Sequence, residues 1–342
     1  MNKSTNLWAA LACMALASCN QPASITGEFE RMTATDSLIV SQNKNFDTIP
    51  APDGKFTYNY QSDQAAILRL MRMPQKPVLG KQNAPMLPPV SVMVLPNTAL
   101  HISGPFEKPV ITGNKFYEEY NRFQEATAGM QREDLHAAIH AYISEHPTSQ
   151  VSLFLLHQYH IKGGEDYLPK FDADIQQGAT KDLYEDICTY YRIRAARQEA
   201  ARNIVVGKQA PDFTLKDMDG NKFTLSSLRG KYVVLDFWGS WCGWCIKGMP
   251  SMKKMYEQYQ DKLEIVSIAC RDKEDKWRAA VKENQMNWTN VINSTEESED
   301  LTIRYNIQFY PHKILLSPEG EILEIVPGEK PAFYTRVDEH LK

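Results

Sequence analysis

The apolar and polar positions follow three different patterns along the chain. Up to about residue 113, short β-prone runs alternate with turn formers, and the clearest runs cover residues 37–40, 56–60 and 90–95. Runs of this kind, bounded by Gly, Pro, Asn and Asp, are typical of strands joined by turns. We therefore predict a small β domain over residues 19–113.

From residue 114 to residue 203 the apolar positions recur at helical spacing. The periodic residues include Leu135, Ile139, Tyr142, Leu183, Ile187 and Tyr191. Thr148 or Ser149, directly after Pro147, is suited to cap the N-terminus of the next helix. We predict a helical segment over residues 114–203.

The last pattern, over residues 204–342, alternates strands with helices. β-prone runs cover residues 232–238, 263–269 and 313–316, and helical patterns begin at about Trp244 and Lys273. Alternation of this kind favours an α/β fold in which helices flank a central mixed sheet.

The first residues have the pattern of an export signal. Lys3 supplies a positive charge, and residues 7–17 form an apolar stretch that is too short to span a bilayer stably. The run Leu-Ala-Ser-Cys at 16–19 resembles the lipobox of bacterial lipoproteins, which implies removal of residues 1–18 and lipidation of Cys19. We expect a lipid anchor that holds the protein to a membrane and faces the periplasm. A plain secretory signal is the alternative, and both export the chain.

Composition and charge exclude some classes of protein. Hydrophobic residues make up 43% of the 342 residues and charged residues 23%, which is an ordinary globular composition. The net charge is -4, and no run of Lys and Arg creates a basic patch. We therefore expect no nucleic-acid partner.

Export permits disulfide bonds, so the spacing of the cysteines matters. Cys13 would leave with the signal and Cys19 would carry lipid, which leaves Cys188, Cys242, Cys245 and Cys270. We expect Cys188 and Cys270 to be small buried apolar side chains. A bond between those two stays open, because only geometry can decide it.

Cys242 and Cys245 form a Cys-x-x-Cys motif directly after the apolar strand at 233–238. A helix that begins at this motif places the first thiol at its N-terminus, where free N–H groups and the helix dipole stabilise a thiolate. Cys242 is therefore the expected nucleophile, and Cys245 is the thiol that resolves a mixed disulfide. A structural disulfide or half of a zinc knuckle are the alternatives.

Histidine pairs in the helical segment raise the question of a metal site. His136 and His140 are four residues apart, and His157 and His160 are three apart. A zinc site needs further ligands, and the sequence points to none. We predict no metal ion and no cofactor.

The last segment resembles thioredoxin, and more closely the exported TlpA/ResA-like branch of the AhpC/TSA superfamily. The resemblance covers about residues 205–342 and rests on Asp-Phe-Trp at 236–238, Trp-Cys-x-x-Cys at 241–245, Pro250, Tyr310-Pro311 and the turn at 317–320. It implies a thioredoxin-like fold, preceded here by the β domain and the helical segment.

The resemblance also assigns roles to individual residues. Asp236 is an isolated carboxylate in an apolar strand, so desolvation should raise its pKa and let it accept the proton of Cys245. A cis Pro311 would present its backbone to a substrate strand. Trp241 and Trp244 either form an apolar rim for a peptide or pack on the domain, and Tyr310 occupies a position that influences partner choice. His312 is expected to be solvated.

Together these features predict reversible thiol-disulfide exchange with protein thiols and disulfides. The TlpA/ResA-like branch implies a reductant supplied by a membrane electron donor, with cytochrome c maturation as one destination. A disulfide oxidase or isomerase is the alternative direction. A thiol peroxidase would need Thr three residues before Cys242, where the chain has Gly239. A partner-binding scaffold is the non-enzymatic alternative.

Overall fold

The computed structural model describes residues 22–42, 45–73 and 87–342, so the predicted signal peptide and Cys19 lie outside the described residues. The chain divides into two compact units between Tyr191 and Arg192, within one helix. None of the helices in the described ranges is long and apolar enough to cross a membrane.

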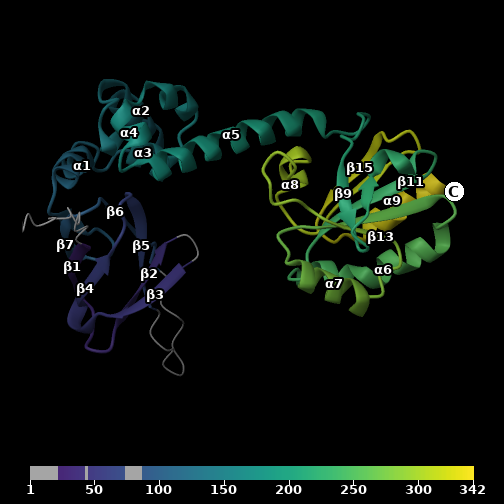
Figure 1. Ribbon diagram of the computed structural model, residues 1–342, viewed down its shortest axis with the longest axis horizontal. Coiled ribbons are helices and arrows are strands. Elements are labelled where there is room, and N and C mark those ends of the chain that lie inside the picture. The colour runs from purple at the N-terminus through teal and green to yellow at the C-terminus, as the bar shows by residue number, and fades with distance from the viewer. Residues whose placement is uncertain (1–21, 43–44, 74–86) are drawn as a thin grey trace, which may run out of the picture. The chain divides into compact units, whose positions relative to one another are not determined.

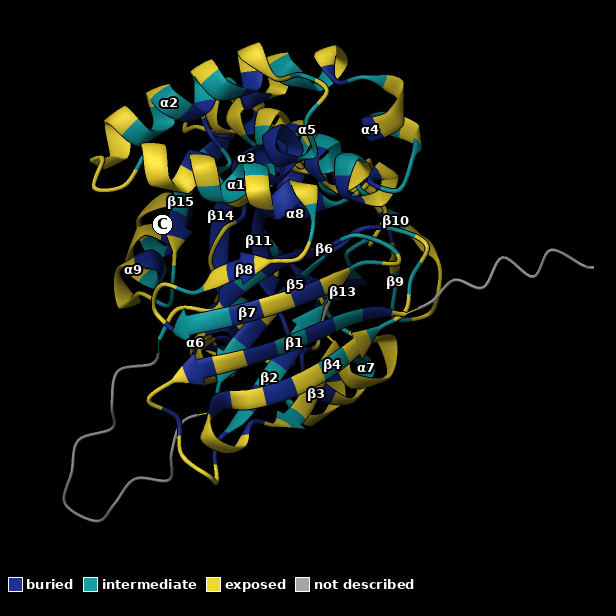
Figure 2. Cartoon of the chain, turned by 90° about the vertical axis from the view of Figure 1, so that its left-hand side faces the viewer, coloured by how far each residue is buried: buried dark blue, intermediate teal, exposed yellow. Residues whose placement is uncertain are grey.

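The N-terminal unit begins with two four-stranded sheets (Figure 1). One sheet has the strand order β4-β1-β7-β8 and the other β3-β2-β5-β6. The strands are β1 Ala23–Glu30, β2 Ser37–Gln42, β3 Asn45–Pro50, β4 Lys55–Tyr60, β5 Ala66–Arg72, β6 Val90–Val94, β7 Ala99–Pro105 and β8 Val110–Thr112. Buried residues alternate with less buried ones along β1 and β2, as expected for strands with one face on a core (Figure 2).

Helices complete this unit and share its core. They are α1 Lys115–Ala126, α2 Arg132–Glu145, α3 Gln150–Tyr159, α4 Ala173–Gln177 and α5 Lys181–Asn203. Ser149 caps α3, and its side chain accepts a hydrogen bond from the backbone N–H of Val151. The apolar side chains of both sheets and of these helices form one continuous buried cluster. The β region and the helical region therefore pack as a single unit.

The C-terminal unit contains a seven-stranded sheet in the order β10-β9-β13-β12-β11-β14-β15. The strands are β9 Thr214–Asp217, β10 Lys222–Thr224, β11 Tyr232–Trp238, β12 Leu263–Ala269, β13 Thr289–Ile292, β14 His312–Leu316 and β15 Ile322–Pro327. β11 pairs parallel with β12 and antiparallel with β14. The predicted mixed sheet is confirmed.

Helices cover both faces of this sheet. They are α6 Gly243–Tyr259, α7 Glu274–Glu283, α8 Leu301–Arg304 and α9 Pro331–Leu341. α6, α7 and α9 share one apolar cluster with Val234 and Trp238, whereas α8 shares another with Leu235 and Phe237. Figure 1 shows α6 and α7 on the side of the sheet opposite α8. β11 is apolar nearly throughout because side chains cover both of its faces.

Candidate active site

The Cys242–Cys245 pair lies where β11 gives way to α6. Cys242 is the N-cap of α6, and the two residues form a disulfide bond with a Cα–Cα distance of 5.3 Å. The backbone N–H of Cys245 donates to Cys242 Sγ at 3.2 Å. In the reduced state, the same N–H and the dipole of α6 would favour a thiolate on Cys242. Cys242 is 6% exposed and Cys245 2%, so Cys242 is the more accessible residue of the pair.

The turn before Cys242 is tied to the loop that follows β12. Asp272 accepts hydrogen bonds from Ser240 N at 2.6 Å and from Ser240 Oγ at 2.7 Å. The indole N–H of Trp241 donates to the carbonyl oxygen of Cys270 at 3.1 Å. Our sequence analysis missed Asp272, because no motif links it to the cysteines. These bonds fix the approach of the chain to the disulfide.

Exposed aromatic side chains belong to the segments around the disulfide. Trp241 is 52% exposed, and Trp244 and Phe309 are each 66% exposed. The rings of Trp241 and Tyr310 meet edge to face at 5.3 Å. Lys247 Nζ lies 4.5 Å from the centre of the Trp244 ring. The sequence analysis named the tryptophans and Tyr310 but missed Phe309.

Tyr310 and Pro311 are joined by a cis peptide bond directly before β14. The carbonyl oxygen of Pro311 accepts a hydrogen bond from the backbone N–H of Gly328 at 2.7 Å. His312, the next residue, pairs with Phe237 of β11. The sheet thus places Pro311 near the C-terminal end of β11, where the cysteine motif begins.

Asp236 is buried on the face of β11 that α6 covers, as Val234 and Trp238 are. Ser267 Oγ donates to Asp236 Oδ2 at 3.2 Å. Burial raises the pKa of Asp236, as we expected, and the nearby Lys313 ammonium opposes that rise.

The expectation of an isolated carboxylate at Asp236 is wrong. Lys313 lies opposite it in the antiparallel pairing of β11 with β14, and its Nζ is 3.8 Å from Asp236 Oδ1. The same Nζ is 2.6 Å from Glu329 Oε2. Tyr334 OH donates to Glu329 Oε1 at 2.7 Å. Two carboxylates therefore share one buried ammonium, and the tertiary fold brings them together from distant parts of the chain.

The expectation of a solvated His312 is also wrong. Its side chain is buried in the sheet, and Nδ1 has no hydrogen-bond partner among the described residues. Desolvation, together with the neighbouring Lys313 charge, lowers the pKa of His312 to about 4. A neutral imidazole here fits the burial of β14 between two other strands.

Two further cysteines lie among the described residues. Cys188 and Cys270 are both free thiols, so the bond left open between them is absent. Cys270 is fully buried, as expected, and desolvation raises its pKa, whereas Cys188 is only partly buried. Within the described ranges, no group of three or more His, Cys, Asp and Glu residues is arranged to hold a metal ion.

A disulfide at a helix N-terminus can be reduced to two thiols and formed again by exchange with other thiols and disulfides. The sheet and helices around it have the arrangement of thioredoxin. The disulfide and the order of the strands are those of a thioredoxin-like unit.

Comparisons with known proteins define the family. The profile of the AhpC/TSA family matches residues 206–325. Thioredoxin-like protein YneN of Bacillus subtilis (strain 168) is 34% identical over 125 residues, which are 36% of this chain and 71% of that protein. Thiol-disulfide oxidoreductase ResA of Bacillus cereus is 32% identical over 126 residues, again 36% of this chain and 71% of that protein. The chain belongs to the AhpC/TSA family and, within it, to the ResA-like thiol-disulfide oxidoreductases.

A solved structure is also similar over the C-terminal unit. The thioredoxin domain of a thiol-disulfide oxidoreductase from Bacteroides vulgatus is 31% identical, with a TM-score of 0.38. The matched region covers 40% of this chain and 99% of the Bacteroides vulgatus chain.

Proposed function

We propose that the protein reduces disulfide bonds of exported proteins in the periplasm. The observation that carries this proposal is the redox pair at the N-terminus of α6, with the buried Asp236 beneath the same helix. A reductant must give two electrons to its substrate and then be reduced again. The membrane is the expected source of those electrons, through a thiol donor, and cytochrome c maturation is one pathway that needs such a reductant.

The proposed reaction has two steps. The Cys242 thiolate attacks one sulfur of a substrate disulfide, which forms a mixed disulfide and releases one substrate thiol. Cys245 then loses its proton to Asp236 and attacks Cys242 Sγ, which releases the second substrate thiol and leaves the Cys242–Cys245 disulfide. Each departing substrate thiolate takes a proton from solvent, so the substrate gains two electrons and two protons. The protein gives up two electrons, the proton that Cys242 lost to solvent on ionising and the proton that Cys245 passes to Asp236. Burial raises the pKa of Asp236, which makes it a better proton acceptor than an ordinary carboxylate.

We assign the substrate contacts to the segments that surround the disulfide. The backbone beside Pro311 would pair with an extended substrate segment. Trp241 and Trp244 present exposed aromatic area, and Tyr310 packs against Trp241 at the same place. These residues would hold the substrate disulfide against Cys242.

We also propose export and lipidation at Cys19. The support is the signal pattern and the Leu-Ala-Ser-Cys run at 16–19. An acyl chain contributes about 0.8 kcal/mol per buried methylene, so two or three chains would give stable attachment. Metabolic labelling with an alkyne fatty acid tests this proposal. Label on the wild type and none on Cys19→Ser is the expected result, and equal labelling of both would refute it.

The direction of electron flow is tested by the reduction potential of the Cys242–Cys245 pair. The protein is equilibrated in glutathione buffers, and free thiols are trapped with a mass-tagging alkylator. A potential below about -220 mV supports a reductant, whereas one near about -120 mV would make the protein an oxidant.

Cys242→Ser should have no insulin-reduction activity. Wild-type activity in that variant would instead favour a scaffold.

A further inference from the structure

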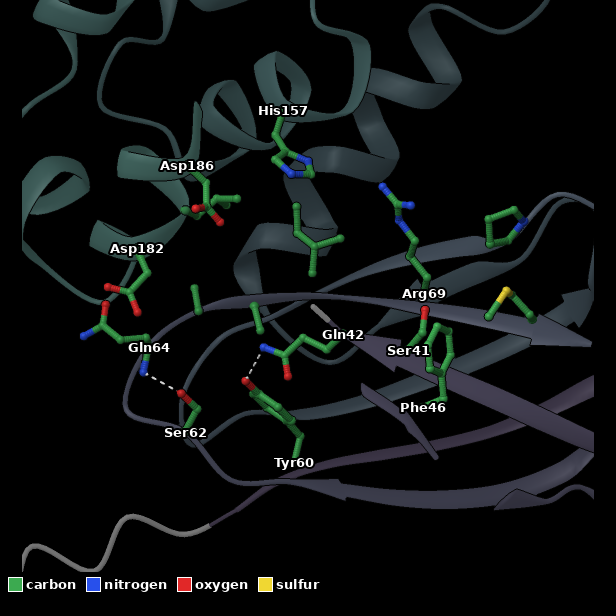
Figure 3. Close-up of a pocket in the computed structure, with 16 residues that line it drawn as sticks. Ser41, Gln42, Phe46, Tyr60, Ser62, Gln64, Arg69, His157, Asp182 and Asp186 are labelled. Carbon is green, nitrogen blue, oxygen red and sulfur yellow. Dashed lines mark hydrogen bonds between the residues drawn. The ribbon is translucent and has the colours of Figure 1, made fainter. Parts of the chain in front are cut away.

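The N-terminal unit contains a hollow of about 540 Å³ between its strands and its helices (Figure 3). This volume is in the ordinary range for sites that bind small ligands. Side chains of β2, β3, β4, β5 and the loop between β4 and β5 line one side, and α3 and α5 supply the other. All of the lining residues belong to the N-terminal unit, so the hollow is separate from the redox pair.

The two ends of the hollow carry opposite charges. Asp182 and Asp186 are one turn apart on α5, and Figure 3 shows both side chains on the helical side of the hollow. Arg69 extends from β5 at the opposite end of the view. None of the three forms an ion pair with any residue in the described ranges. No ion pair among the described residues therefore joins the two ends of the hollow.

Arg69, Asp182 and Asp186 are exposed to solvent at the two ends of the hollow, and among the described residues that line it neither end holds an opposite charge. The pKa of Asp186 is raised by desolvation and by the neighbouring Asp182 and Glu185 carboxylates. His157 lies between Asp186 and Arg69 in Figure 3, close enough to Arg69 to sense its charge, and its Nδ1 is buried without a hydrogen-bond partner among the described residues. Burial keeps this imidazole neutral, with a pKa lowered to about 4. It therefore offers a hydrogen bond and no charge.

The chemistry of the two ends selects one kind of ligand. A simple anion would satisfy Arg69 but would leave the two carboxylates unpaired. A simple cation would do the reverse. A molecule with an ammonium group at one end and a carboxylate at the other satisfies both, and charge-assisted hydrogen bonds of this kind are the stronger ones. The strand side of the hollow is lined by Gln42, Tyr60 and the exposed ring of Phe46. Gln42 Nε2 donates a hydrogen bond to Tyr60 OH at 2.8 Å.

We propose that this hollow binds a short zwitterionic peptide. The peptide's ammonium group would lie against Asp182 and Asp186, and its carboxylate against Arg69 and His157. The amides between them would meet polar side chains of the strands, such as Gln42. This binding site does not depend on the redox chemistry, and Cys242→Ser should leave it intact.

Equilibrium dialysis of radiolabelled trialanine against the full chain, purified in detergent, tests the proposal on the wild type. Unlabelled trialanine should compete, whereas N-acetyl-trialanine and trialanine amide should each compete about tenfold more weakly, because each has lost one charged end. A dissociation constant weaker than about 1 mM would overturn the proposal. Equal competition by the blocked peptides would also overturn it.

Variants then assign the two ends. Arg69→Gln should make trialanine and its amide equivalent, and Asp186→Asn should reduce the preference for trialanine over its acetylated form. Arg132→Gln and Asp134→Asn on α2 are matched controls, because both residues are exposed and neither lines the hollow. If the controls weaken binding as much as the site variants do, the assignment is wrong. Circular dichroism confirms that each variant is folded.

Discussion

Asp236 shows how burial changes the chemistry of a single side chain. A carboxylate that is 1% exposed loses its hydration, and the partial compensation by Lys313 leaves its pKa raised. A raised pKa suits a group that must take a proton from Cys245 near neutral pH. The same property costs stability, because the folded protein must ionise a carboxylate that it has desolvated.

We predict that Asp236→Asn stabilises the oxidised protein at neutral pH. The folded state binds the Asp236 proton more tightly than the unfolded state, so wild-type stability falls as pH rises from the unfolded pKa of about 3.9 to the raised folded pKa. The asparagine variant has no such loss. Its free energy of unfolding at neutral pH should exceed that of the wild type by about 1.4 kcal/mol for each unit by which folding raises the pKa of Asp236. Urea unfolding between pH 4 and pH 8 measures the difference.

The control for Asp236→Asn is Glu283→Gln, which changes an exposed carboxylate on α7 and should leave the pH dependence of unfolding unchanged. An advantage of Asp236→Asn that is constant over this pH range would contradict the argument. The variant should also slow the release of reduced insulin, because Cys245 has lost its proton acceptor.

At the scale of elements, the register of β11 with β14 places Lys313 opposite Asp236, and the segment before α9 adds Glu329. We predict that Lys313→Met destabilises the oxidised protein by about 3–5 kcal/mol at pH 7. Removing one partner leaves buried carboxylates without their counter-charge. Urea unfolding measures the loss. The double variant Lys313→Met/Glu329→Gln should recover part of the lost stability, because it removes one of the unpaired carboxylates. If Lys313→Met were as stable as the wild type, the ammonium group would contribute nothing to the free energy of unfolding.

A second element-scale feature is the connection between the turn before α6 and the loop after β12. We predict that Asp272→Ala destabilises the protein by about 1–3 kcal/mol, because Ser240 N and Oγ lose a charged acceptor. It should also slow insulin reduction, because the chain leading to Cys242 is less well held. Asp275→Ala, an exposed residue in the first turn of α7, is the control. Equal effects of the two substitutions would argue against a positioning role for Asp272.

Patterns local in the sequence predicted the elements well. The strand at 232–238, the helix after it and the strand at 263–269 agree with β11, α6 and β12, since continuous apolar runs and a clear helical start produced them. The sequence analysis missed β9, β10, β13 and β15. The first three have four residues or fewer and too short a pattern to detect, whereas β15 has six residues.

The parts of the site that the sequence did not predict depend on tertiary structure. Lys313 and Glu329 meet Asp236 only through strand pairing, and Asp272 meets Ser240 only because two loops end at the same edge of the sheet. His312 was misjudged for the same reason. Its burial follows from the place of β14 between β11 and β15 in the sheet, and a histidine has no local pattern that shows this.

At the scale of the whole molecule, the two units have separate apolar cores, although α5 belongs to both. The last part of α5 makes its contacts with the C-terminal unit. Arg197 Nη1 donates to the carbonyl oxygens of Thr302 at 3.2 Å and of Ile307 at 3.1 Å. Arg192 forms an ion pair with Glu297 at 2.6 Å. The boundary at which the redox unit can be separated therefore lies within the helix.

We predict that a fragment of residues 192–342 folds and reduces insulin at the rate of the full chain. The free energy of unfolding of a shorter fragment, residues 204–342, should be about 2 kcal/mol lower than that of the longer fragment. The shorter fragment loses the two charged hydrogen bonds of Arg197, which are partly buried, whereas the exposed Arg192–Glu297 pair contributes at most about 1 kcal/mol. Urea unfolding of both fragments measures the difference, and Arg197→Ala in the longer fragment should reproduce most of it. Equal stability of the two fragments would place the functional boundary after α5, and failure of both to fold would mean that the redox unit needs the N-terminal unit to fold.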